Sequence, residues 1–248
     1  MFSLKDVARI ISIDSSVNIC YSIHNKRIDQ SVKEVYMGFE AFEKLPEDKQ
    51  EMILSAGIRE FSQKSYKEAS TDSITKACGI SKGILFHYFG SKKEFYLFCL
   101  ERAMQKLNTP TESPGDAANF YDILFSSMDE KMALCTHYRD EMHMVNMASR
   151  DAATEIAMRK AELLQRYAVQ KKTESATTLK RALQALPLKD GINLQVMVEC
   201  VSLYCNAVLN KYLIQYQQTP DDFFKNREAI QSEMKQYFDM MLFGICKE

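Results

Sequence analysis

The amino-acid sequence predicts an all-α protein. Breakers of regular structure are scarce, because 248 residues contain only 8 glycines and 5 prolines, and this shortage favours long helices over sheets with many turns. Apolar residues recur at three- and four-residue steps along nearly the whole chain, which is the spacing of one helix face. No convincing strand pattern or internal repeat interrupts that spacing.

The composition limits the classes of protein to consider. A chain of this length with 46% hydrophobic residues can bury a sizeable core in one or two domains. The longest apolar runs are far too short to span a membrane, and no secretion signal opens the sequence, so we expect a soluble, cytoplasmic protein. The seven cysteines are scattered without a CxxC pair, which favours reduced thiols over disulfides or zinc ligands.

Proline and glycine residues that interrupt the helices divide the chain into three predicted domains. Pro46 and the stretch from Pro110 to Gly115 bound the middle one. The domains are a helical extension over 1–45, a second helical domain over 46–107, and a third over 108–248.

The middle domain opens with a long predicted helix over 47–63. Glu47 and Asp48 suit its N-terminus, where the helix dipole favours negative charge. Its apolar stripe predicts a buried face made of Ile53, Leu54, Gly57, Ile58 and Phe61.

Three further helices are predicted after it, and each begins at a serine that can cap it. Ser70 is a good N-cap for a helix over 71–78, with an inward face of Ile74, Ala77 and Cys78. Gly79 supplies the positive φ of a tight turn. Ser81 caps a second short helix that ends at Phe89, and Ser91 caps a long helix that reaches about Leu107.

Two short helices joined by a glycine turn form the helix-turn-helix plan of DNA readers, whose second helix enters the major groove by its first residues. Here Lys82 can donate to guanine O6 or N7, Gly83 admits close backbone approach, and Ile84 can touch a thymine methyl group. Four lysines against Asp72 alone make residues 70–93 locally basic on a chain of net charge −1. The predicted DNA-contacting residues are Ser70, Thr71, Ser81, Lys82, Gly83, Ile84, Phe86, His87, Tyr88 and Lys92.

The stretch "SYKEASTDSITKACGISKGILFHYFGSKKEF", residues 65–95, resembles the DNA-binding domain of the tetracycline-repressor (TetR) family of bacterial transcription regulators. The resemblance covers residues 47–107, and Ser65 replaces the glycine that usually precedes the tyrosine. It implies a homodimer with a helical C-terminal domain that holds a small-molecule pocket. Separately, we expect no cofactor and no catalytic residues.

The C-terminal part contains its own signals. Helices over 192–217 and 223–246 can pair with those of a second copy as a four-helix bundle, or simply close the core of one chain. Six of the 14 methionines lie between Met128 and Met158, which favours an adaptable, hydrophobic ligand over ordinary core filling. The candidate ligand-binding residues are Tyr121, Met128, Met132, His137, Tyr138, Met144 and Met147.

Catalytic and metal sites find no support. Steps of two and six residues place Cys135, His137 and His143 on different helix faces, so they do not form a predicted metal site. No nucleophile triad, phosphate loop or paired acids emerge. Two alternatives remain: a helical ligand- or partner-binding protein whose helix-turn-helix no longer reads DNA, and a small-molecule enzyme on a helical scaffold.

The first 45 residues loosely resemble the headpiece of lactose-repressor (LacI) family regulators, from "LKDVAR" to "SVKEVYMGFEAFEKL". The turn glycine of that headpiece is missing, and its second helix offers no early Arg or Gln. The extension is therefore either a degenerate second DNA reader or a helical cap packed against the next domain.

The sequence thus predicts a ligand-responsive regulator, expected to act as a repressor. A homodimer would present two 81–89 helices to a near-palindromic double-stranded operator. From the resemblance, a small hydrophobic effector would bind the third domain, shift the 91–107 helix and release the DNA.

Overall fold

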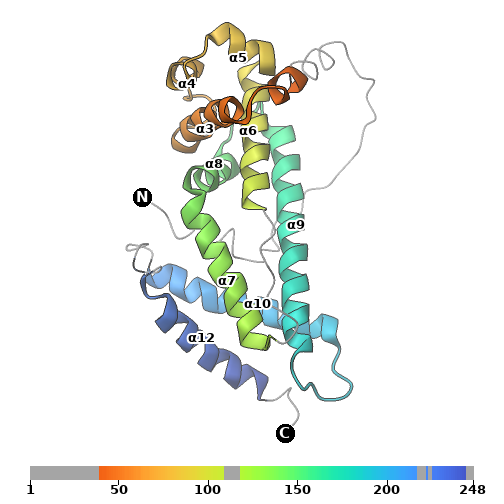
Figure 1. Cartoon of the computed structure of the whole chain (residues 1–248). Coiled ribbons are helices and arrows are strands. Elements are labelled where there is room, and N and C mark those ends of the chain that lie inside the picture. The colour runs from red at the N-terminus through yellow and green to blue at the C-terminus, as the bar shows by residue number, and fades with distance from the viewer. Residues whose placement is uncertain (1–38, 109–117, 217–221, 223–224, 244–248) are drawn as a thin grey trace. The chain divides into compact units, whose positions relative to one another are not determined.

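The computed structural model describes residues 39–108, 118–216, 222 and 225–243, and its helices are shown in Figure 1. They group into two compact units. The first unit contains residues 39–108 and 138–167, and the second contains residues 118–137 and 168–243 as far as they are described. Helix α9, Ala157–Gln184, contributes its beginning to the first unit and its remainder to the second. No β-sheet forms among the residues described, which confirms the predicted all-α class.

The first unit is built around α3, Glu47–Gln63. It is followed by α4, Thr71–Cys78, α5, Lys82–Phe89, and α6, Lys92–Leu107. The predicted caps are confirmed: the hydroxyls of Ser70, Ser81 and Ser91 accept from the backbone N–H groups of Ser73, Ile84 and Glu94. Gly79 has the left-handed conformation, with φ 65°. These caps fix where each helix starts, because each satisfies an N–H group that has no partner within its helix.

Side chains of α6 lie directly against Gly57 of α3. A Cβ atom there would lie 2.5 Å from Phe95 Cζ and 2.8 Å from Cys99 Sγ. The predicted face of α3 is buried as expected, with Ile53, Ile58 and Phe61 at most 2% exposed. On α4, however, Ala77 is exposed and Thr75 is buried with Ile74 and Cys78. The inward face of α4 is therefore rotated toward Thr71 and Thr75.

An aromatic cluster joins the end of α5 to α6 and to residues 39–43. The ring of Phe89 lies 4.5 Å from that of Phe95, 5.0 Å from Phe42 and 5.2 Å from Phe98, measured between centroids. Phe39 stacks on Phe98 at 5.1 Å. Residues 39–43 are helical, so the end of the predicted extension packs into the first unit. Residues 1–38, and with them most of the LacI-like stretch, lie outside the described residues.

Helix α8, Arg139–Arg150, also belongs to the first unit, although its sequence falls within the predicted third domain. It packs against α3 and α6, with Met142, Met144 and Ala148 fully buried. Lys106 of α6 donates to Glu51 at 2.6 Å and to Glu141 at 3.2 Å, so one lysine joins α3, α6 and α8.

The second unit contains α7, Phe120–His137, the later part of α9, α10, Leu194–Gln215, and α12, Arg227–Leu242. Its core is formed by apolar side chains from all four helices, among them Phe120, Leu183, Val201, Tyr212 and Phe238. Helices α10 and α12 lie side by side (Figure 1), with the Tyr204 and Phe238 rings 5.6 Å apart. Both match the predicted pair of C-terminal helices.

Candidate nucleic-acid interface

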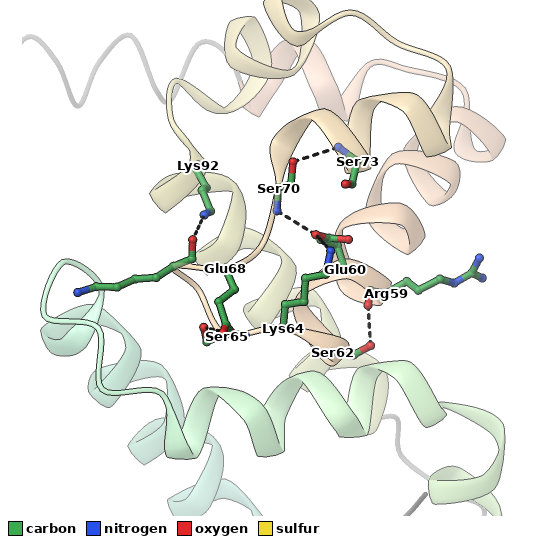
Figure 2. Close-up of polar contacts among 10 residues, drawn as sticks. Arg59, Glu60, Ser62, Lys64, Ser65, Glu68, Ser70, Ser73 and Lys92 are labelled. Carbon is green, nitrogen blue, oxygen red and sulfur yellow. Dashed lines mark hydrogen bonds and ion pairs between the residues drawn. The ribbon is translucent and has the colours of Figure 1, made fainter.

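The candidate interface begins with the loop that joins α3 to α4, which Figure 2 shows in detail. Glu60 of α3 accepts from Ser70 N at 2.9 Å and from Lys64 Nζ at 2.8 Å. Burial acts to raise the pKa of Glu60, but these bonds from Lys64 and Ser70 outweigh it and lower the pKa. The carboxylate therefore stays ionised and holds the start of α4 in place.

Lys92 is directed toward the same loop. Its Nζ donates to the carbonyl oxygen of Lys67 at 3.3 Å (Figure 2) and lies 4.9 Å from the centre of the Tyr66 ring. Burial lowers the pKa of Lys92, against the raising effect of nearby acids such as Glu155. The sequence analysis assigned Lys92 to phosphate, and in the structure it also secures the loop before α4.

The first residues of α5 form the exposed part of the site. Ser81, Lys82, Gly83 and Ile84 are exposed, and His87 follows one turn later on the same side. On the opposite side, Leu85 and Phe89 are fully buried. The helix is thus fixed by its apolar face while its N-terminal end faces solvent.

Lys82 makes an ion pair that the sequence analysis did not anticipate. Its Nζ lies 3.1 Å from a carboxylate oxygen of Asp72 on α4. Both side chains are exposed, so this pair contributes little to stability, about 0–1 kcal/mol. Asp72 places a negative charge beside the side chain expected to contact guanine.

The remaining predicted contact residues are placed in different ways. Thr71 is only 8% exposed, so its side chain faces the core of the first unit. Phe86 and Tyr88 are half-buried, and the Tyr88 ring meets Phe42 edge-on at 5.9 Å. Two further lysines are exposed, Lys67 before α4 and Lys76 on α4.

The structure does not bring the predicted ligand-binding residues together. Met128 lines a cavity in the second unit, and Met132 is buried in that unit. Met144 and Tyr138 lie in the first unit, and His137 is exposed. Tyr121 donates its hydroxyl to Asp239 of α12. The methionines are near one another in the sequence, but α7 and α8 pack in different units.

Two further findings concern other classes of site. None of the described helices is both long enough and apolar enough to cross a lipid bilayer. Within the described ranges, no three His, Cys, Asp or Glu side chains gather as a metal site would require.

Comparisons with known proteins bear on this geometry. A sequence profile described as "Bacterial regulatory proteins, tetR family" matches residues 53–97, from α3 into α6. The "Uncharacterized HTH-type transcriptional regulator YuxN" of Bacillus subtilis (strain 168) is 36% identical over 62 residues, which are 25% of this chain and 21% of that protein. This chain thus covers about a fifth of its curated relative.

Two solved structures can be compared over a longer range. A TetR family transcriptional regulator from Chloroflexus aurantiacus J-10-FL has a TM-score of 0.52 at 19% identity, covering 84% of this chain and 98% of that one. A TetR transcriptional regulator from Rhodococcus sp. RHA1 has a TM-score of 0.38 at 14% identity, covering 74% and 93%. The tetR-family profile thus matches across the exposed reading helix, and the chain shares its fold with the Chloroflexus protein.

Proposed function

We propose that the chain is a cytoplasmic transcription regulator that binds a near-palindromic DNA operator as a homodimer and leaves it when a small molecule binds the second unit. One observation carries the proposal: the first residues of α5 are exposed while its other face is locked into the aromatic core. A helix held in this way can enter the major groove without losing its position on the protein.

The chemistry of the exposed end suits base recognition. Lys82 can donate to guanine O6 and N7 once it exchanges Asp72 for DNA, and Ile84 offers an apolar contact for a thymine methyl group. Gly83 has no side chain to hold the backbone away from the base edges. Lys67, Lys76 and Lys92, with the N-terminus of α6, supply positive charge for the flanking phosphates.

Homodimerisation is supported by an exposed apolar stripe on the second unit. Leu203 is 68% exposed and Ile214 is 73% exposed, and both lie on the same face of α10 as Val196. Met240 and Phe243, on and just after α12, are exposed as well. Apolar side chains gathered on neighbouring helices are typical of a surface that a partner covers. A two-fold dimer would also present two α5 helices to half-sites ~34–36 Å apart.

Selection of bound fragments from sheared bacterial genomic DNA tests the proposal. The full chain is expected to enrich a short sequence with two-fold symmetry, and the Lys82→Ala variant is expected to lose most of that enrichment. Lys180→Ala, on an exposed part of α9, is the matched control and should select like the original chain. Failure to enrich any sequence would favour the alternative in which the helix-turn-helix does not read DNA.

A further inference from the structure

The second unit contains a cavity of about 80 Å³ lined by α7, α9, α10 and α12. Its apolar walls come from Leu124 and Met128 of α7, Leu179 and Ala182 of α9, Leu209 of α10 and Met234 of α12. Methionine side chains adapt their shape to a ligand at low cost. An apolar body of a few carbon atoms therefore suits the cavity.

One cationic side chain lines this cavity. Lys131 lies one turn beyond Met128 on α7, and its Nζ donates to Ser175 Oγ of α9 at 3.3 Å. Burial lowers the pKa of Lys131, and the positive charge of Lys171 lowers it further. Glu174 is nearby but is paired with Lys171 at 3.1 Å. Throughout the described part of the chain, no carboxylate lies within ion-pair distance of Lys131.

A partly buried lysine without an acidic partner is costly, and a bound anion can offset that cost. Ser175 adds a hydroxyl that can donate to the same anion. The contact between Lys131 and Ser175 also marks the polar end of the cavity. Helices α7 and α9 run in opposite directions along it (Figure 1), so Leu124 and Ala182 lie about two turns away from the polar end. The cavity thus has a charged end and an apolar end.

We propose that this cavity binds a small organic acid, whose carboxylate pairs with Lys131 and Ser175 and whose short apolar chain lies between Leu124, Leu179 and Met234. The inference rests on the proposed function, because it assigns a class of ligand to the effector site of that regulator. It replaces a purely hydrophobic effector with an amphiphilic anion, and it names Lys131 as the residue that selects the charge.

The test uses three probes of equal chain length: hexanoate, 1-hexanol and hexylamine. Calorimetric titration of the full chain, without DNA, is expected to give hexanoate an affinity at least tenfold above that of hexanol, because a charge-assisted hydrogen bond adds about that factor. Hexylamine is expected not to bind. Equal affinities for hexanoate and hexanol, or no hexanoate binding at millimolar concentration, would overturn the proposal.

Variants test the role of Lys131 itself. Lys131→Met keeps the length and apolar stem, so it is expected to lose the preference for hexanoate while still binding hexanol. Lys131→Arg should restore part of the preference, and Lys180→Met on the exposed side of α9 should not change it. A Lys131→Met variant that folds, by circular dichroism, and binds hexanoate like the original chain would refute the assignment.

The inference and the proposed function fail separately. Binding of hexanoate is measured on the protein alone, whereas operator selection is measured on DNA without ligand. A chain that selects no operator but binds hexanoate through Lys131 would refute the regulator proposal and leave the ligand assignment intact. A chain that selects an operator but does not bind hexanoate would refute the ligand assignment and leave the regulator proposal intact.

Discussion

Gly83 is the residue at which protein stability and DNA binding are expected to respond in opposite directions. It is exposed near the start of α5, and a Cβ atom there would meet only Ser81 Oγ, at 3.7 Å. Gly83→Asp therefore fits the fold, and an acidic group near a helix N-terminus contributes about 0.3–1 kcal/mol of stability. The same carboxylate would face the phosphates and base edges. We expect unchanged or higher resistance to urea and at least a tenfold loss of operator affinity, measured by fluorescence anisotropy.

Gly83→Ala is the control for Gly83→Asp. It adds a methyl group without charge and is expected to stabilise the helix by up to about 1 kcal/mol. Operator binding by Gly83→Asp at the original affinity would show that the start of α5 does not face DNA.

Asp72 restrains the residue expected to contact guanine. Its carboxylate lies 3.1 Å from Lys82 Nζ on the exposed surface between α4 and α5. Asp72→Asn frees the lysine and removes a negative charge next to the DNA, so we expect operator affinity to rise several-fold. The gain should shrink as salt rises, because surface charges are screened. Anisotropy titrations at two salt concentrations measure both effects.

The expected change in stability for Asp72→Asn is small, within about 0.5 kcal/mol, as for other exposed pairs. Glu68→Gln is a useful comparison, because Glu68 is also exposed but is bonded to Ser65 in the loop before α4. An Asp72→Asn variant with lower operator affinity would mean that Lys82 needs Asp72 to hold its orientation.

At the scale of helices, the position of α5 depends on how closely α3 approaches α6. Gly57 permits that approach, since a Cβ atom would overlap Phe95 and Cys99, and Phe95 in turn contacts Phe89 at the end of α5. Gly57→Ala is expected to destabilise the protein by about 1–3 kcal/mol through overpacking. Urea unfolding followed by circular dichroism measures this change in the free energy of unfolding. Gly83→Ala, which is expected to stabilise the protein, is the comparison. A neutral Gly57→Ala would mean that α6 moves away freely.

The helices of the first unit were predictable because their boundaries are encoded locally. Ser70, Ser81 and Ser91 each cap the helix that follows, and Gly79 takes the one conformation that ends α4. The pairing of Lys82 with Asp72 and the inward direction of Lys92 were not predicted. These contacts join residues 10 and 25 positions apart, so they depend on tertiary packing.

The predicted ligand-binding residues are separated in the structure, for a related reason. Methionine density pointed to residues 128–158, yet the structure divides them between the two units, and only Met128 among the predicted set lines the cavity. Lys131 gave no local signal, since a lysine on an amphipathic helix is usually exposed. Its role in the proposed ligand site depends on Ser175, which is 44 positions away, and on the absence of a carboxylate within ion-pair distance among the described residues.

For the whole molecule, α9 is the helix that both units share. Its first turns are tied to α6 by Arg159–Glu94 at 2.5 Å and Arg166–Glu101 at 3.1 Å. Its later turns supply Leu179 and other walls of the cavity. The sequence analysis assigned the link between ligand and reader to the 91–107 helix alone. These ion pairs make α9 a second candidate for that proposed link.

The exposed stripe on α10 carries the last prediction, which concerns assembly. Leu203 and Ile214 are 11 residues apart, close to three helical turns, so both side chains project from one face. Glutamate at both positions leaves the core of the chain untouched but places two charges in the proposed dimer interface. Leu203→Glu with Ile214→Glu is therefore expected to be monomeric by sedimentation velocity, whereas the original chain is expected to be a dimer. The monomer should bind the full operator much more weakly, because it contacts one half-site instead of two.

Met158→Glu is the control for this double variant. It introduces glutamate at a residue of the first unit that is 76% exposed, and it should leave the dimer intact. A double variant that remains dimeric with a normal circular dichroism spectrum would place the interface elsewhere.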